Sequence, residues 1–265
     1  MSAWGRLLEQ SHSRGHFVQL YGDEPSLARG AGVFFREGLR RGGSVLAVTT
    51  PQHRCLFEEE LSGLGADVGG LESSRRLVFL DAQATLARVT VDGQPDWARF
   101  EETIRAAIRS VAAPNTPQAL RAYGEMVGIL WNARQHAAAL RLENLWNKLL
   151  EDVDFSLYCA YKFDVLGGDL RAKSLRSVLH AHTHVVPSDL DGALERALDR
   201  SMDELLGPEA RDLRDRAHGD VRSDGTIISN AERSILWLRE SLPAEADRIL
   251  RRAREYYLRQ PCGAH

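Results

Sequence analysis

Five short apolar runs, each followed by a segment with helical spacing, constrain the fold of this chain most. Helical segments such as "PSLARGAGVFFREGLRRG" and "WARFEETIRAAIRSVAA" lie between these runs. Strands that alternate with helices predict a mostly parallel central sheet with helices on both faces, an α/β fold. The predicted strands are "HFVQLYG" (16–22), "SVLAVTT" (44–50), "RLVFLDA" (76–82), "ALRAYGE" (119–125) and "FSLYCAYKF" (155–163).

The pattern changes after Pro187, where helical segments follow one another with no strand between them. Pro243 should interrupt the last of these helices, because proline breaks a helix interior. We therefore predict an α/β domain over residues 1–187 and a helical C-terminal extension over 188–265. The apolar stripes of the extension need a partner surface. We expect that surface to be the sheet domain or a second copy of the chain, in a homodimer.

Composition narrows the class of protein. The 265 residues carry a net charge of -3, which gives no pull towards nucleic acid or an anionic membrane. No apolar run approaches the roughly 18 residues of a membrane span, and the N-terminus lacks the apolar core of a secretory signal. The 3 cysteines form no C-x-x-C pair, so no disulfide framework is indicated. We expect a cytoplasmic protein without direct contact to nucleic acid or membrane.

Polar residues fall where the predicted strands end. Ligands of open parallel sheets bind beyond the carboxyl ends of the strands, so Glu125, in "RAYGEMVGILW", is a candidate wall of a cleft with Tyr21 near its rim. The alternative is that Glu125 only caps the following helix, since an acid suits a first turn. The residues expected at this edge are Tyr21, Asp23, Thr49, Thr50, Asp81, Glu125, Tyr161 and Lys162.

Nucleotide-binding motifs are absent from the sequence. The first predicted strand leads into "LYGDEPSLARGAG", which has neither the Gly-Lys-[Ser/Thr] of a phosphate-binding loop nor a lysine. Its "GDEP" brings two negative charges to the place where a phosphate needs positive ones. This argues against a nucleotide-hydrolysing enzyme, although the fold of one remains possible.

Several blocks of the sequence resemble the MEDS family, the methanogen and methylotroph sensory domains that include the dichloromethane regulator DcmR. These blocks are the stretch from His16 to Arg54 beginning "HFVQLYGDEP", then "RAYGEMVGILW", "LENLWNKL", "FSLYCAY" and "HTHVVP". The resemblance implies a RecA/KaiC-like domain that has lost its phosphate loop. It also implies a sensory or regulatory role with a small, hydrocarbon-derived ligand. Family members are often joined to DNA-binding or kinase modules, and neither pattern is present here.

On this basis we expect a ligand-binding domain that signals through a protein partner, with no catalytic activity and no cofactor. The alternative is an enzyme, either a residual nucleotide-binding enzyme of RecA/KaiC-like fold or a metal-dependent hydrolase. A third reading is a pure interaction protein that acts through its helical extension.

The block "LENLWNKL" offers further candidates. Glu143 and Asn147 share one helix face, with Trp146 within the same turn. An acid, an indole and an amide beside an apolar stripe could line a small-molecule site. We expect the helix that carries them to form or brace one side of the cleft at Glu125. The alternative is that Trp146 is plain core, and Trp131 has the same ambiguity. The predicted ligand-binding residues are Glu125, Tyr21, Trp131, Glu143, Trp146, Asn147, Tyr161, His16 and His184.

Three histidines in "HAHTHVV" suggest a metal site. If the segment is extended, His180, His182 and His184 point the same way, and if it is helical only His180 and His184 share a face. The metal-dependent alternative would use them. The segment could instead be a loop that enters the extension. We retain only His184 as a pocket residue and predict no metal site. Cys159, within a central strand, is expected to be an inert buried thiol.

Overall fold

The computed structural model describes residues 14–112, 120–164, 166–167, 177–186, 192–219 and 230–259. The chain divides into two compact units, Met1–Lys162 and Phe163–His265. Residues 187–191, where the sequence places the boundary between the α/β domain and the helical extension, lie outside the described residues. The predicted division into domains at 187/188 stays a prediction.

The first unit is built on a sheet in which all five predicted strands are present. Every pairing within this set is parallel. Four of the strands are buried along most of their length, as expected when helices cover both faces of a sheet. The order of all five strands in the sheet is β3-β2-β6-β7-β1. Their bounds are β1 His16–Tyr21, β2 Ser44–Thr49, β3 Leu77–Asp81, β6 Leu120–Gly124 and β7 Ser156–Lys162.

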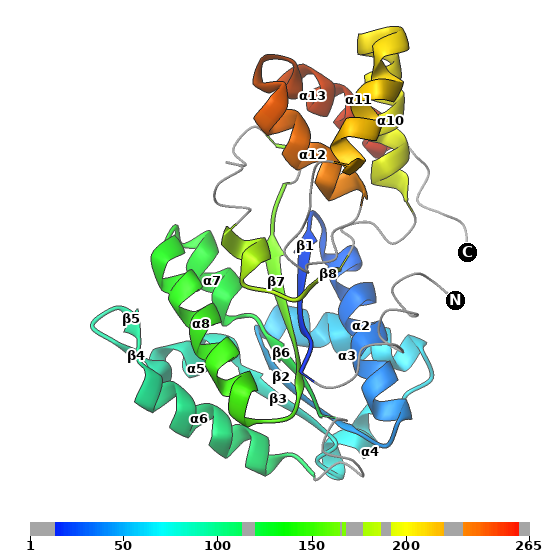
Figure 1. Cartoon of the computed structure of the whole chain (residues 1–265). Coiled ribbons are helices and arrows are strands. Elements are labelled where there is room, and N and C mark those ends of the chain that lie inside the picture. Colours follow the sequence, from blue (N-terminus) through cyan, green and yellow to red (C-terminus); the bar gives the residue numbers. More distant parts are fainter. Residues whose placement is uncertain are drawn as a thin grey trace. The chain divides into compact units, whose positions relative to one another are not determined.

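Helices cover the two faces of this sheet in two groups (Figure 1). On one face lie α2 (Glu24–Arg40), α3 (Pro51–Gly63) and α4 (Val68–Ser73). On the other lie α5 (Ala82–Val89), α6 (Trp97–Ser110), α7 (Met126–Asn132) and α8 (His136–Asp152). A small antiparallel hairpin, β4 (Thr90–Val91) with β5 (Gln94–Pro95), connects α5 to α6. The predicted α/β fold is therefore confirmed.

Residues 126–152 form two helices, α7 and α8, with a break between them. Arg134 has a φ of 61°, the left-handed conformation that ends a helix. The backbone N–H of Gln135 donates to the carbonyl of Leu130 at 2.9 Å, which closes the end of α7. No glycine or proline lies at this break, so the sequence carries no local signal for it.

Aromatic side chains fill the core on both faces of the sheet. On the α2 side, Phe57 packs edge-on against Tyr123, with ring centroids 4.9 Å apart. On the α8 side, Trp146 packs edge-on against Phe100 at 4.8 Å and lies 6.3 Å from Phe155. Trp146 has 0% exposure. Trp146 therefore lies in the core, which is the alternative that the sequence left open for it.

Two helical glycines should respond to alanine with opposite signs. A Cβ on Gly128, in α7, would lie 2.8 Å from the carbonyl oxygen of Ala160 in β7, so Gly128→Ala must push the helix off the strand. We expect it to lower the free energy of unfolding by about 1–3 kcal/mol. Gly63, in α3, has open space around its added Cβ, and Gly63→Ala should be neutral or stabilising by up to about 1 kcal/mol. Urea unfolding of both variants measures this, and equal effects would contradict it.

The described part of the second unit is almost entirely helical, as predicted for the extension. Residues 177–180 form a short helix, and β8 (His184–Val186) a short strand. The predicted break at Pro243 is confirmed, since one helix ends at Ser241 and the next begins at Pro243. The other elements are α10 (Ala193–Leu206), η2 (Gly207–Glu209), α11 (Ala210–Gly219), α12 (Asn230–Ser241) and α13 (Pro243–Arg259).

Within this unit, α10 and α13 are joined by a buried hydrogen bond of 2.7 Å from the Ser201 hydroxyl to the carbonyl of Ile249. Arg252 of α13 also pairs with Glu204 of α10 at 2.7 Å. The two helices therefore bury their apolar stripes against each other. Among the helices that the structure describes, none combines the length and apolar character that crossing a bilayer requires.

Candidate functional site

Glu125 lies where β6 passes into α7, at the carboxyl edge of the sheet. Its backbone N–H donates to the carbonyl of Val48 in β2 at 3.0 Å, which fixes the turn against the neighbouring strand. Its side chain makes no capping hydrogen bond to α7 and is only 7% exposed. Glu125 thus occupies the N-cap position of α7, but its carboxylate does not cap that helix and faces the end of β2 instead.

The end of β2 supplies donors to this carboxylate. One oxygen, Oε2, accepts hydrogen bonds from the Thr49 hydroxyl and from the Thr50 backbone N–H, both at 2.8 Å. The other, Oε1, accepts from the Thr50 hydroxyl at 3.1 Å. Thr50 is also the N-cap of α3, with Pro51 in the first turn, so the start of that helix is bonded directly to Glu125.

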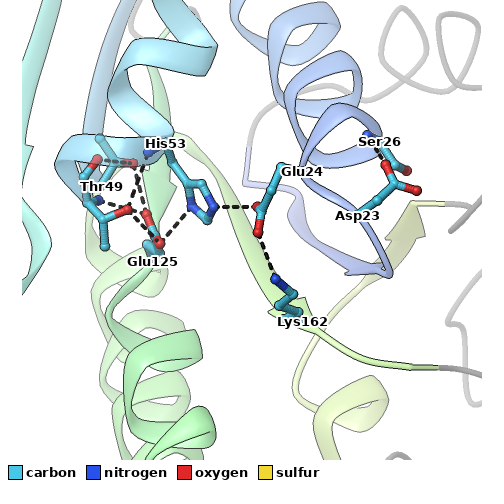
Figure 2. A network of polar contacts seen from close by, with 8 residues as sticks. Asp23, Glu24, Ser26, Thr49, His53, Glu125 and Lys162 are labelled. Atoms are coloured by element: carbon cyan, nitrogen blue, oxygen red, sulfur yellow. Dashed lines mark hydrogen bonds and ion pairs between the residues drawn. The ribbon is translucent and has the colours of Figure 1, made fainter. Parts of the chain in front are cut away.

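His53, in the first turn of α3, lies between two carboxylates (Figure 2). Its Nδ1 is 2.7 Å from Oε1 of Glu125, and its Nε2 is 2.6 Å from Oε2 of Glu24. Glu24 stands at the start of α2, and its other oxygen accepts from Nζ of Lys162 at 2.8 Å. Acid, imidazole, acid and ammonium thus alternate across this edge, and we name these four residues, Glu125, His53, Glu24 and Lys162, the edge network.

Contacts within the edge network shift the pKa values of Glu125, His53 and Glu24 towards the charged forms of these three groups. Burial opposes the charge of Glu125, but His53 and the donors of Thr50 and Thr49 hold the Glu125 pKa below its ordinary value. Burial likewise opposes protonation of His53, but Glu125 and Glu24 raise the His53 pKa above its ordinary value. Because opposite charges favour the charged forms, the two carboxylates stabilise His53 as an imidazolium.

Tyr21, which we predicted near the rim of a cleft, lies beside the edge network. Its ring is edge-on to His53, with centroids 6.1 Å apart, and it is 5% exposed. Burial, followed by the charges of Glu24 and Glu125, raises the Tyr21 pKa well above its ordinary value. The phenol therefore stays protonated and can act as a donor.

A hollow of about 140 Å³ opens at the carboxyl ends of β2 and β3. Thr49 and Thr50 line it, and both residues also donate hydrogen bonds to Glu125. Phe79 and Pro51 give it apolar surface, and Arg54 and Asp81 give it charge. A larger hollow of about 470 Å³ includes Arg76, ahead of β3, and Arg36 of α2. The carboxyl-edge rule for parallel sheets favours the smaller one.

The remaining predicted residues of the first unit form a second group, between β1, β7 and α8. His16 Nδ1 is 2.8 Å from the amide oxygen of Asn147, and the Tyr161 hydroxyl donates to Glu143. Trp131 packs edge-on against Tyr161, with centroids 5.4 Å apart. We expected Glu143, Trp146 and Asn147 to brace the cleft of Glu125. Glu143 instead contacts this second group, while Glu125 contacts the edge network.

The three histidines of "HAHTHVV" have different surroundings. His180 ends a short helix and is exposed, whereas His182 is buried with Nδ1 2.7 Å from the carbonyl of Val178. His184 begins β8 and is half-buried, and burial lowers its pKa. The segment is neither one strand nor one helix, so neither arrangement proposed for a histidine metal site is formed.

The sequence analysis did not identify His53 as a site residue, and it did not predict that Glu24 pairs with His53 and Lys162. His53 lies three residues after Thr50, so its place in a first turn at the carboxyl edge was a usable signal. Glu24 was noted only as an acid unsuited to phosphate. Cys159 is buried in β7, as expected, and burial and Glu143 raise its thiol pKa.

The fold and the edge network together define a class, a parallel α/β domain with a buried charged network at its carboxyl edge. The chain belongs to the MEDS family: residues 15–183 match the MEthanogen/methylotroph, DcmR Sensory domain. The family is one of sensory domains, and the resemblance drawn from the sequence blocks is confirmed. No curated protein matches the chain.

Proposed function

We propose that the chain is a sensory or regulatory protein that binds a small molecule in the hollow at the ends of β2 and β3. The observation that carries the proposal is the sharing of Thr49 and Thr50 between this hollow and the buried carboxylate of Glu125. Membership of a family of sensory domains supports the same role.

The size and lining of the hollow suggest the kind of ligand. A cavity of about 150 Å³ in another protein holds benzene, a molecule of six non-hydrogen atoms, and this hollow of about 140 Å³ is similar. Phe79 and Pro51 suit a short carbon skeleton, and Thr50, Arg54 and Asp81 suit a polar group. We therefore propose a small, hydrocarbon-derived molecule with one polar group.

A route for the signal follows from the edge network. A ligand that hydrogen-bonds the Thr50 hydroxyl competes with Oε1 of Glu125 for that donor. Thr50 caps α3, and His53 in the same turn contacts both Glu125 and Glu24 at the start of α2. Occupation of the hollow would thus alter the contacts at the starts of α2, α3 and α7 together. We propose that a protein partner, or a second copy of the chain in a homodimer, reads that change.

The test uses a panel of one- to four-carbon alcohols, aldehydes, ketones and carboxylates, with ATP included. We expect at least one small compound to raise the melting temperature of the full chain, because a ligand that binds only the folded state stabilises it. A molecule retained through purification would appear in the native mass spectrum. Thr49→Val should abolish the shift.

Thr85→Val is the matched control, because Thr85 is also a buried threonine whose hydroxyl bonds a backbone carbonyl, but it lies outside the hollow. It should keep the ligand-induced shift. If no compound shifts the melting temperature and no molecule is retained, the proposal is wrong. Equal responses of the two valine variants would also count against a site at this hollow.

We also propose that the chain is not an enzyme. Asp23 caps α2 by accepting from the backbone N–H of Ser26 at 2.8 Å, and Glu24 follows in the first turn. Two acids thus stand where a phosphate-binding loop would present lysine and backbone N–H groups. Tight binding of ATP in the panel, with phosphate release that Glu125→Gln abolishes, would favour the nucleotide-binding alternative instead.

A further inference from the structure

Three metal-ligand side chains meet in the second group, between β1, β7 and α8. His16 is the first residue of β1, Cys159 lies in the neighbouring strand β7, and Glu143 comes from the covering helix α8. All three are buried, with exposures of 1%, 0% and 0% for His16, Cys159 and Glu143. An imidazole, a thiol and a carboxylate facing one another in a protein interior are costly to bury unless they are paired or bound to a metal.

The three donor atoms form a nearly equilateral triangle. His16 Nε2 lies 3.4 Å from Cys159 Sγ and 3.4 Å from Glu143 Oε2, and Cys159 Sγ lies 3.6 Å from the same Glu143 oxygen. Zinc binds nitrogen and oxygen at about 2.0–2.2 Å and thiolate sulfur at about 2.3 Å in a tetrahedron. That geometry separates neighbouring ligand atoms by about 3.4–3.6 Å, the spacing found here.

Neighbouring side chains orient two of the three donors so that they can bind a metal ion. The amide oxygen of Asn147, 2.8 Å from His16 Nδ1, accepts the Nδ1 hydrogen and leaves the Nε2 lone pair directed at the cluster. The Tyr161 hydroxyl donates to Oε1 of Glu143, while Oε2 faces His16 and Cys159. Partners of this kind fix the tautomer and the orientation of metal ligands in known sites.

We propose that His16, Glu143 and Cys159 bind a zinc ion, with Asn147 and Tyr161 as the residues that position two of the ligands. The mixed nitrogen, oxygen and sulfur donors suit zinc among the common divalent metals. Binding replaces the thiol proton by the Cys159–zinc bond and releases that proton to solvent. Three protein donors leave a fourth position for another ligand. This site is separate from the hollow and does not depend on the function proposed for it.

A hydrogen-bonded trio without metal is the competing explanation, in which the Cys159 thiol donates to Glu143. The two explanations differ in the state of the sulfur, because a metal-bound cysteine is a thiolate. Cobalt(II) reports this state through a thiolate-to-metal charge-transfer absorption. The sequence has cysteines at positions 55, 159 and 262, so a Cys55→Ser/Cys262→Ser double variant leaves Cys159 as the only thiol.

The experiment uses the full chain as this double variant, produced in zinc-supplemented and in cobalt-supplemented medium. We expect about one metal ion per chain by elemental analysis, together with the charge-transfer absorption in the cobalt form. Adding Cys159→Ser should abolish the absorption and lower the metal content at least about tenfold. Asn147→Leu should weaken zinc binding by about 10–100-fold, measured by competition with a chelator.

Cys55→Ser alone is the matched control, because Cys55 is an exposed cysteine and should retain full metal content. The double variant decides the question even if Cys159→Ser does not fold, since any thiolate absorption in it must come from Cys159. Metal content near zero in both media, with no charge-transfer absorption, overturns the proposal. So does equal metal content in the Cys55→Ser and Cys159→Ser proteins.

Discussion

Glu125→Ala should lower the free energy of unfolding by about 3–5 kcal/mol. Removing one partner of a buried ion pair leaves the other buried and uncompensated, and losses of this size are typical. Here the substitution removes the carboxylate beside His53 Nδ1, although Nε2 keeps Glu24, and it leaves the donors of Thr49 and Thr50 without their acceptor. A helix cap would cost only about 1 kcal/mol, so urea unfolding at neutral pH separates the two roles.

Glu102→Ala is the matched control, because Glu102 is an exposed acid on α6, and we expect a change within about 0.5 kcal/mol. Glu125→Gln should fall between the two, since it keeps the shape and one acceptor oxygen but loses the charge. If Glu125→Ala and Glu102→Ala unfold alike, the edge network does not contribute to stability as proposed.

His53→Gln should have the second large effect, and that effect should depend on pH. It leaves the carboxylates of Glu125 and Glu24 facing each other without the cation between them, so the loss near pH 6 should again be about 3 kcal/mol or more. The folded-state pKa of His53 is raised. Its contribution is therefore fully present below the unfolded pKa of about 6.5 and is lost as pH rises through the folded pKa.

The difference in stability between the wild type and His53→Gln should thus shrink from pH 6 towards pH 9. Below pH 6 the stability should also fall because of Glu125. The folded-state pKa of Glu125 is lowered, so its contribution to the free energy of unfolding is lost as pH falls through that pKa. Unfolding curves at a series of pH values measure both. His180→Gln, at an exposed histidine, is the matched control, and a pH-independent difference for His53→Gln would contradict the charged pairing.

Much of the first unit could be predicted from the sequence, because the residues that indicate each strand lie within or next to that strand. Each strand is a short apolar run with a turn residue or proline near its end, and burial on both faces of a parallel sheet produces that composition. The same reasoning placed Glu125 and Tyr21 at the carboxyl edge, where they lie. The break between α7 and α8 was not predictable, since it depends on a left-handed Arg134 with no glycine or proline beside it.

The sequence by itself determined the α/β fold, the family and the edge of the sheet at which Glu125 stands. Only the tertiary structure decided which side chains meet. Strand order is not sequence order: β6 pairs with β2, which brings Glu125 to Thr49 and Thr50 across 75 residues or more. His16 likewise reaches Cys159 and Glu143 only because β1 pairs with β7 and α8 covers them. Periodicity records whether a residue is buried, whereas its partner is set by the crossovers that place distant strands side by side.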